Sequence, residues 1–284
     1  MGAASTDYEF TNSLIGYFKY LAQIFGDLAD KLYGVNSSFV ADATVTAGFT
    51  AAGATLTTLF LVMEISTFAF NINFKDGLES GIRLAMKTVL YLILIENVPN
   101  ATAIITEIFQ NIGGTSFSDS FTEVVKPYTT IAAVNADTLK AGTLNINLIF
   151  LDIMIVVALL ISLVLFILIL ISMAGLVFET AILTVISPVA VCTLINTQAR
   201  STGIAFLKNF AAVNMQWGLY SVCFNVFGEL YSEFDLTNEF AELVGTSSGG
   251  ASVALQCMTP LFAMALLCVS ISKVGDFAKR ALGG

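Results

Sequence analysis

Residues 153–178, IMIVVALLISLVLFILILISMAGLVF, decide the fold class because this stretch contains no charged residue. A helix needs about 20 predominantly apolar residues to cross the hydrocarbon core of a bilayer. The stretch is long enough for one complete crossing. It predicts a transmembrane helix and therefore an all-α membrane protein.

Four further stretches predict transmembrane helices, which makes five in total. They are residues 43–74, 82–98, 209–228 and 243–272. The first is interrupted only by Glu64, and the last two carry no charge. The stretch 82–98 begins with two basic residues, whose long side chains can reach the interface. As an alternative, residues 101–112 complete this span after a break near Pro99.

The basic residues predict the orientation of the chain, because Lys and Arg concentrate in cytoplasmic loops. With a cytoplasmic C-terminus and an extracytoplasmic N-terminus, eight of the 12 basic residues lie inside. These are Lys75, Arg83, Lys87, Arg200, Lys208, Lys273, Lys279 and Arg280. We therefore expect a multi-pass membrane protein whose C-terminus lies in the cytoplasm. It has an extracytoplasmic segment 1–42 and one transmembrane domain 43–284, with outer loops 113–147 and 229–250.

The N-terminal segment predicts an amphipathic helix over residues 7–33. Its apolar positions recur every three or four residues, as one face of a helix requires. They are Leu14, Phe18, Leu21, Phe25, Leu28 and Leu32. The polar face is acidic, whereas helices that lie on anionic lipid usually have a basic one. This favours contact with a protein over a position flat on the outer leaflet, and packing within the same chain remains an alternative.

Composition excludes several classes of function. Charged residues make up 12% of the chain and hydrophobic residues 56%, which does not suit a soluble enzyme. The net charge of −9 leaves no basic stripe for nucleic acid. The chain has no histidine, so catalytic triads and histidine metal sites cannot form. We expect no enzyme activity, no cofactor and no metal site.

Four residues in or beside the spans are candidates for a pore or a helix interface. They are Glu64, Asp152, Glu179 and Pro188. A charge in hydrocarbon is costly unless it faces protein or water. Glu64 alone lies deep in a span, and no basic partner is evident for it. It predicts either a structural or pore-lining role or, as the alternative function, a small-solute or ion-coupled transporter.

Basic residues at the cytoplasmic ends of the spans form a second group of candidates. Lys75, Glu79, Arg83 and Lys87 follow one another at intervals of four, so they share one face of a helix. This face, together with Arg200 and Lys208, is a candidate docking surface for a cytoplasmic partner. The alternative is a solvated face that follows the positive-inside rule.

Residues 174–220, AGLVFETAILTVISPVAVCTLINTQARSTGIAFLKNFAAVNMQWGLY, carry a family resemblance. They combine the end of a long apolar span, an amphipathic segment with a proline inside the helix at Pro188, a polar turn over 196–203 and a Phe/Lys-containing entry into the next span. In this pattern the chain resembles the TrbL-type channel proteins of conjugative type IV secretion systems. It is similar to their shorter, Gram-positive-like form, since it has no long polar C-terminal extension.

The resemblance implies a non-enzymatic channel or platform subunit of a secretion machine, without a cofactor, in the bacterial cytoplasmic (inner) membrane. It implies a homo-oligomeric ring, with a pentamer expected, that contacts membrane lipids. The other implied partners are further secretion-system subunits, including cytoplasmic ATPases, and the transferred DNA or protein substrate. Small residues in the first span, such as Gly48 and Gly53, also favour close helix packing and hence an oligomer.

Overall fold

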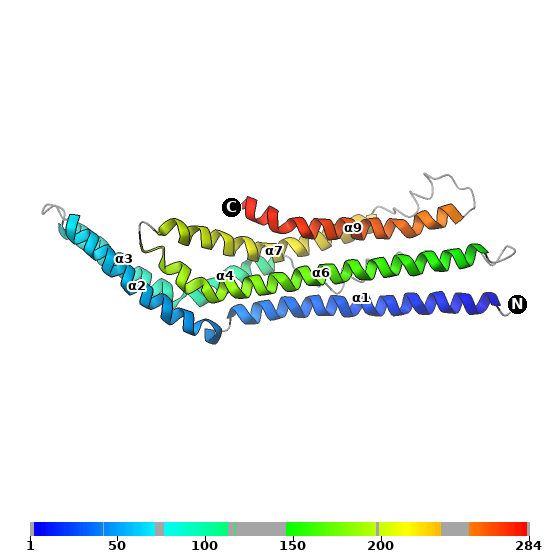
Figure 1. The fold of residues 1–284 in the computed structure, drawn as a ribbon, viewed down its shortest axis with the longest axis horizontal. Helices are drawn as coiled ribbons and strands as arrows, with labels where there is room; N and C mark the ends of the chain where they lie inside the picture. Colours follow the sequence, from blue (N-terminus) through cyan, green and yellow to red (C-terminus); the bar gives the residue numbers. More distant parts are fainter. Residues whose placement is uncertain are drawn as a thin grey trace. The chain divides into compact units, whose positions relative to one another are not determined.

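The computed structural model of the chain is almost entirely helical over the residues that it describes. These residues are 3–41, 43–71, 77–112, 117, 146–196, 199–233 and 250–282. The helices are α1 (Ala3–Ala41), α2 (Ala43–Asn71), α3 (Gly77–Glu96), α4 (Val98–Asn111), α6 (Ile146–Cys192), α7 (Arg200–Glu233) and α9 (Gly250–Ala281), labelled in Figure 1. The predicted all-α class is confirmed over these ranges.

Two of these helices are long and apolar enough to cross a membrane. They contain the segments Ala47–Thr67 of α2 and Val156–Cys192 of α6. The bent pair of α3 and α4 brings the number to three if it forms one broken span. The prediction of five spans with a defined orientation goes beyond this and stays a prediction.

The predicted outer loops overlap the ends of two helices. The range 229–250 includes the last residues of α7, which continues to Glu233. Gly228 destabilises a helix by only about 1 kcal/mol relative to alanine, which is not enough to end one whose next five residues are good helix formers or neutral. The range 113–147 includes the first two residues of α6, which begins at Ile146. Apart from Phe117, residues 113–145 lie outside the part that the structure describes.

The chain forms two compact units, each made of segments that are separate in the sequence. The first contains the described residues of Met1–Leu32, Gly114–Ala174 and Leu219–Lys273. The second contains those of Tyr33–Gly113, Gly175–Gly218 and Val274–Gly284. The predicted division at residue 42 corresponds to the end of α1 but not to a border between these units.

Aromatic packing holds the helices of the first unit together. The rings of Phe18 and Phe25 on α1 lie 6.0 and 5.9 Å from the ring of Phe166 on α6. Phe117 packs edge-on against Phe224 of α7 at 5.5 Å, and its backbone N–H donates to the Asp30 carboxylate at 2.9 Å. Part of the predicted apolar stripe of α1 therefore packs within the same chain.

The predicted stripe coincides only partly with the face that α1 buries, because Phe18 is buried but other members are not. Leu21 and Leu28 are exposed, whereas Ala22, Gly26 and Ala29 are buried. Small residues let neighbouring backbones approach closely, so they define the packing face even where larger apolar side chains are available. The helix is also longer than the predicted range 7–33, since it spans Ala3–Ala41.

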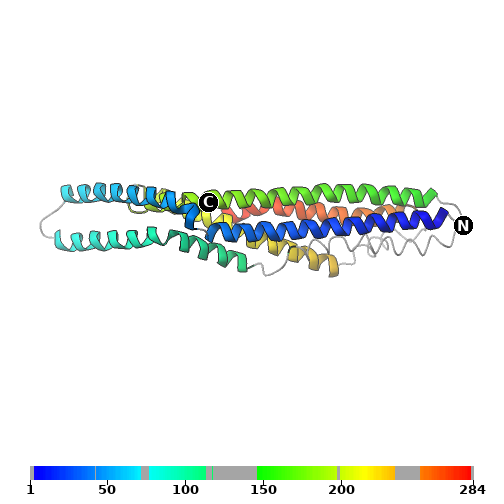
Figure 2. The same ribbon diagram turned by 90° about the horizontal axis from the view of Figure 1, so that it is seen from below.

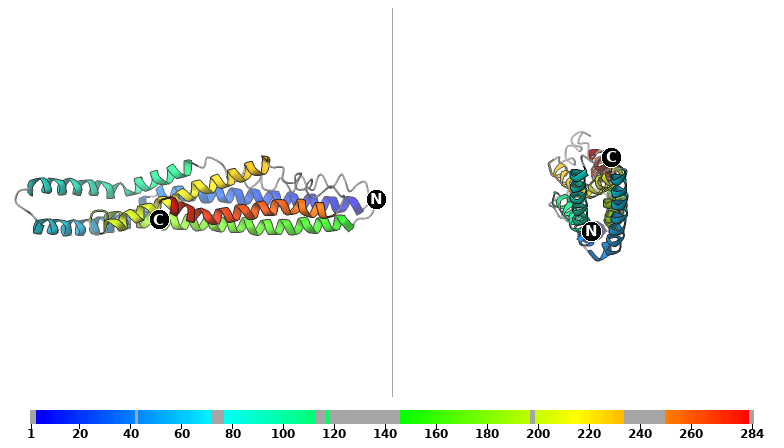
Figure 3. Two further views of the ribbon diagram at one scale, coloured as in Figure 1. Left: turned by 90° about the horizontal axis from the view of Figure 1, so that it is seen from above. Right: turned by 90° about the vertical axis from the view of Figure 1, so that its left-hand side faces the viewer.

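In the second unit, α2 and α3 lie side by side, as Figure 2 shows. After Asn97 the chain changes direction by 63° between α3 and α4, which is visible in Figure 3. The side-chain amide of Asn97 donates to the carbonyl of Ile93 at 2.7 Å, and Pro99 occupies the first turn of α4. Proline at this position needs no backbone donor, so the predicted break has the expected cause.

Buried polar contacts join α4 to α1 and α7 in this unit. The hydroxyl of Thr106 donates to the amide oxygen of Asn214 at 2.7 Å, and both residues are buried. The phenol of Tyr33 donates to the backbone carbonyl of Gln110 at 2.7 Å, and burial raises the pKa of this phenol. Tyr33 therefore stays a hydrogen-bond donor across the physiological pH range.

Pro188 lies inside α6 without ending it, because a neighbouring side chain replaces the hydrogen bond that proline cannot make. A residue in a helix normally donates its N–H to the carbonyl four positions earlier, which here belongs to Thr184. The hydroxyl of Ser187 donates to this carbonyl at 2.6 Å. The pair Ser187–Pro188 thus allows α6 to continue to Cys192 beyond the predicted span 153–178.

Close helix packing in this unit predicts a strong effect of one glycine. A Cβ atom on Gly53 of α2 would lie 2.8 Å from the Pro188 carbonyl oxygen, whereas one on Gly48 would meet nothing within 4 Å. We expect Gly53→Ala to lower the free energy of unfolding by about 1–3 kcal/mol, because backbone atoms must move apart. Gly48→Ala should be neutral or stabilising by up to about 1 kcal/mol.

Thermal unfolding of the two variants in the same detergent measures this difference. Equal midpoints for Gly53→Ala and Gly48→Ala would contradict the close contact between α2 and α6.

Candidate functional site

The candidate site lies where one face of α2 meets one face of α3. On α2, Leu56, Phe60 and Glu64 follow one another at intervals of four residues. On α3, Lys87 and Tyr91 are spaced in the same way, so each set lies on one side of its helix. Each face therefore combines one charged residue with apolar or aromatic residues.

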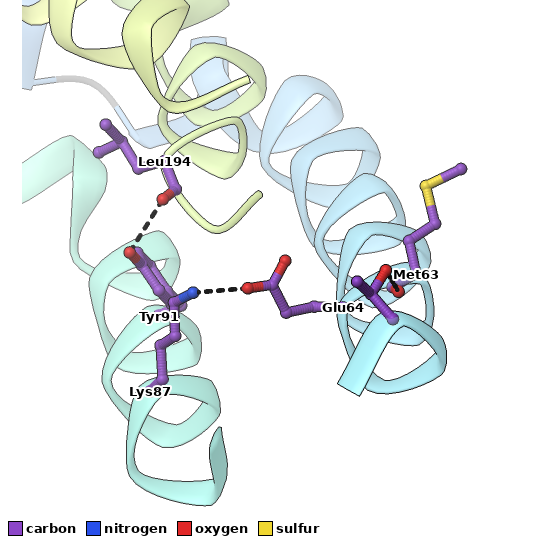
Figure 4. A network of polar contacts seen from close by, with 6 residues as sticks. Met63, Glu64, Lys87, Tyr91 and Leu194 are labelled. Carbon is purple, nitrogen blue, oxygen red and sulfur yellow. Dashed lines mark hydrogen bonds and ion pairs between the residues drawn. The ribbon is translucent and has the colours of Figure 1, made fainter. Parts of the chain in front are cut away.

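Glu64 and Lys87 form an ion pair across this interface. The Lys87 Nζ atom donates to the Glu64 Oε1 atom at 3.0 Å, as Figure 4 shows. The side chains are 19% (Glu64) and 33% (Lys87) exposed. Two opposite charges in contact present almost no net charge to apolar surroundings, which makes them far less costly there than either one alone.

A second contact ties the same face of α3 to the end of α6. The Tyr91 hydroxyl donates to the backbone carbonyl of Leu194 at 2.9 Å, one helical turn from Lys87 (Figure 4). Beside this bond, Ile95 packs with Cys192 and Ile195 in a buried apolar cluster. The ion pair and the α6 end therefore belong to one packed region of the second unit.

The carbonyl groups at the end of α6 are satisfied locally. The Cys192 thiol donates to the Val189 carbonyl and the Thr193 hydroxyl to the Ala190 carbonyl, both at 2.7 Å. Backbone bonds of the tighter, three-residue kind follow, from Leu194 to Val191 at 3.0 Å and from Ile195 to Cys192 at 3.2 Å. These bonds leave the Leu194 carbonyl to accept from Tyr91 and fix the turn that leads to α7.

The structure does not bring the predicted pore or interface residues together as one set. Glu64 pairs with Lys87, and Pro188 is buried against α2. Glu179 is half-buried on α6, with no ion pair among the described residues. Asp152 lies in the first turns of α6, but its side chain is outside the described part of the structure.

The predicted docking residues are also separated. Arg83 pairs with Glu79 at 2.6 Å on the exposed side of α3, as their spacing predicts. Lys87, placed on the same face in the prediction, instead binds Glu64. Arg200 begins α7 and Lys208 lies two turns further along it. Lys75 falls outside the described residues.

The expectation that Glu64 lacks a basic partner is therefore wrong. The missing signal was the short connection between two long helices, which makes them antiparallel neighbours. Glu64 lies seven residues before the end of α2 and Lys87 ten residues after the start of α3. At about 1.5 Å per residue the two positions lie at similar heights in such a hairpin. The bond from Tyr91 to Leu194 has no such signal in the sequence, because the two residues are 103 positions apart.

The chemistry available to this site is binding and positioning. One carboxylate and one ammonium group are joined, and a tyrosine anchors the neighbouring turn. Among the described residues, no group of three His, Cys, Asp or Glu side chains is arranged to hold a metal ion. The arrangement fits a fixed joint between helices, which can open only if both charges find other partners.

A double-mutant cycle tests the strength of this joint. For Glu64→Gln, Lys87→Met and the double variant we expect a coupling energy of about 1–3 kcal/mol. Each single change leaves the other charge uncompensated in apolar surroundings. The Glu79–Arg83 pair is the matched control, since its side chains are 71% and 78% exposed. Its coupling should be no more than about 0.5 kcal/mol.

Unfolding in detergent or bicelles gives both coupling energies. Equal values for the two pairs would mean that Glu64 and Lys87 are solvated and do not form a joint.

Comparison of the chain with known proteins finds no relative. No family model, no curated protein and no solved structure matches this chain. The function of the chain must therefore be inferred from its own residues and contacts.

Proposed function

We propose that this protein is a non-enzymatic channel or platform subunit of a type IV secretion machine and assembles as a homo-oligomeric ring in a bacterial cytoplasmic membrane. The observation that supports assembly most directly is the exposed apolar face of α6. The support for the secretion machine is the pattern of residues 174–220, with a proline inside a helix, a turn and a second helix.

The exposed apolar face of α6 is too long for a single bilayer crossing. Its members follow one another along the helix with the spacing of one broad face. They are Ile153, Val157, Leu160, Ile161, Val164, Ile167, Leu168, Ile171, Phe178, Ile182 and Ile186. At about 1.5 Å per residue this face extends over about 50 Å, whereas the hydrocarbon core is about 30 Å thick.

Tilting does not remove this excess. A helix tilted by about 40°, the upper end of the usual range, still extends about 38 Å along the membrane normal. Apolar side chains beyond the hydrocarbon core need a protein surface to cover them. A second copy of the chain is the simplest source of that surface, and repeated contacts of this kind close into a ring.

The local structure of 174–220 fits a rigid platform. Ser187 completes the hydrogen bonding around Pro188, and Tyr91 holds the following turn. The turn then leads into α7, whose first residue is Arg200. A conduit assembled from several copies needs such fixed joints, because the copies must keep one geometry while a substrate passes.

A second candidate function is an ion-coupled transporter. Two observations favour it: the carboxylate of Glu64 within the candidate span Ala47–Thr67, and the bend of 63° after Asn97. Broken helices and buried acids are common in transporters. The ion pair with Lys87 weighs against a transporter, because the Lys87 ammonium group already compensates the charge of this carboxylate.

Native mass spectrometry of the protein in nanodiscs tests the proposed assembly. We expect a ring of several copies, with five as the expected number. Phe178→Ser should weaken it, because Phe178 lies at the end of the predicted span 153–178 and is 70% exposed. Phe262→Ser on α9, at 69% exposure, is the control and should leave the oligomer intact. A strictly monomeric protein that binds no secretion ATPase would overturn the proposal.

Uptake by sealed vesicles separates the two candidate functions. If the protein is a platform subunit, Glu64→Gln leaves the proton-coupled flux of small solutes at the level of empty vesicles, as does the unchanged protein. A flux that the unchanged protein supports and Glu64→Gln abolishes would favour the transporter instead.

A further inference from the structure

A groove in the second unit lies between the start of α7 and the end of α9. Its volume is about 410 Å³, within the usual range for small-molecule sites. The polar part of its wall consists of Ser201, Lys208 and Asn209 from α7 and Lys279 from α9. The groove thus brings together residues that are 71 positions apart in the sequence, Lys208 and Lys279.

The groove combines positive charge with apolar surface. Ile204 and Leu282 line it beside the two lysines. No ion pair of Lys208 or Lys279 is found in the described part of the chain. A site with this character suits a ligand that has one anionic group attached to an apolar body.

The surroundings of the groove are basic as well. The start of α7, residues 200–218, has two basic residues and no acid. The end of α9, residues 274–282, has Lys279, Arg280 and a single acid, Asp276. These two segments together therefore have four basic residues and one acid, and this excess of positive charge favours an anion.

The positions of the two lysines along α7 and α9 favour an anionic lipid over a soluble anion. Lys208 directly precedes the charge-free stretch 209–228, which the sequence predicts as a membrane span. Lys279 follows the charge-free stretch 243–272 by two helical turns. Both lysines are thus expected at the level of the headgroups on the cytoplasmic side, where the leaflet is rich in anionic phospholipid.

We propose that this groove is a binding site for an anionic phospholipid. The Lys208 and Lys279 ammonium groups bind the phosphate, and Ser201 and Asn209 donate hydrogen bonds to the headgroup. Ile204 and Leu282 contact the start of an acyl chain. The site rests on the predicted spans 209–228 of α7 and 243–272 of α9, and it is independent of the secretion machine.

The protein is released from bilayers of mixed phosphatidylglycerol and phosphatidylcholine. Native mass spectrometry then measures which lipid stays bound. We expect retention of phosphatidylglycerol in preference to phosphatidylcholine. Lys208→Gln and Lys279→Gln should each weaken retention about fivefold, and the double variant about thirtyfold, because each lysine contributes to holding the phosphate.

Arg280→Gln is the matched control, since Arg280 neighbours Lys279 on α9 but does not line the groove. It removes the same charge and should change retention less than about twofold. The conservative variant Lys208→Arg/Lys279→Arg should restore binding. Circular dichroism of all variants checks that the helices are intact.

Three outcomes would overturn the proposal. Equal loss for Arg280→Gln and Lys279→Gln would mean diffuse attraction of lipid to a basic end of the protein. Displacement of the lipid by millimolar inorganic phosphate would identify a site for a soluble phosphate compound. Equal retention of both lipids would mean that the groove does not select charge. None of these bears on the oligomer, so the lipid site and the proposed function can fail separately.

Discussion

The hydrogen bond from the Ser187 hydroxyl to the Thr184 carbonyl supports the central helix of this protein. In apolar surroundings an unsatisfied backbone carbonyl costs several kcal/mol, so a proline inside a long apolar helix needs a replacement donor. Ser187 supplies it one residue before Pro188. The carbonyl of Pro188 can then approach Gly53, and α6 can reach the turn that Tyr91 holds.

The same constraint explains the other polar contacts in the second unit. Thr106 binds Asn214, Tyr33 binds the Gln110 carbonyl, and Lys87 binds Glu64. Each joins two helices, and each leaves its groups satisfied where water is scarce. Hydrophobicity does little to choose partners among apolar helices, so these bonds and the small residues decide which faces meet.

Much of the fold could be predicted from the sequence, but few of the contacts could. The charge-free run 153–178 and the break near Pro99 have strong local causes, and both appear as helices and a bend where expected. The buried face of α1 could not be predicted in this way, because its packing uses Ala22 and Ala29 in preference to Leu21 and Leu28. Apolar periodicity identifies the broad apolar side of a helix, but the small residues that allow close backbone approach decide which part of that side is buried.

The ion pair of Glu64 and Lys87 has a consequence for the free energy of placing α2 and α3 in a membrane. The helix α2 holds one acid, Glu64, whereas α3 holds two bases and two acids. Joined as a hairpin, they present a cancelled pair, and Arg83 is left near the entry with Glu79 beside it. Entry of the two helices into a bilayer as a pair would therefore cost less free energy than entry of each helix alone.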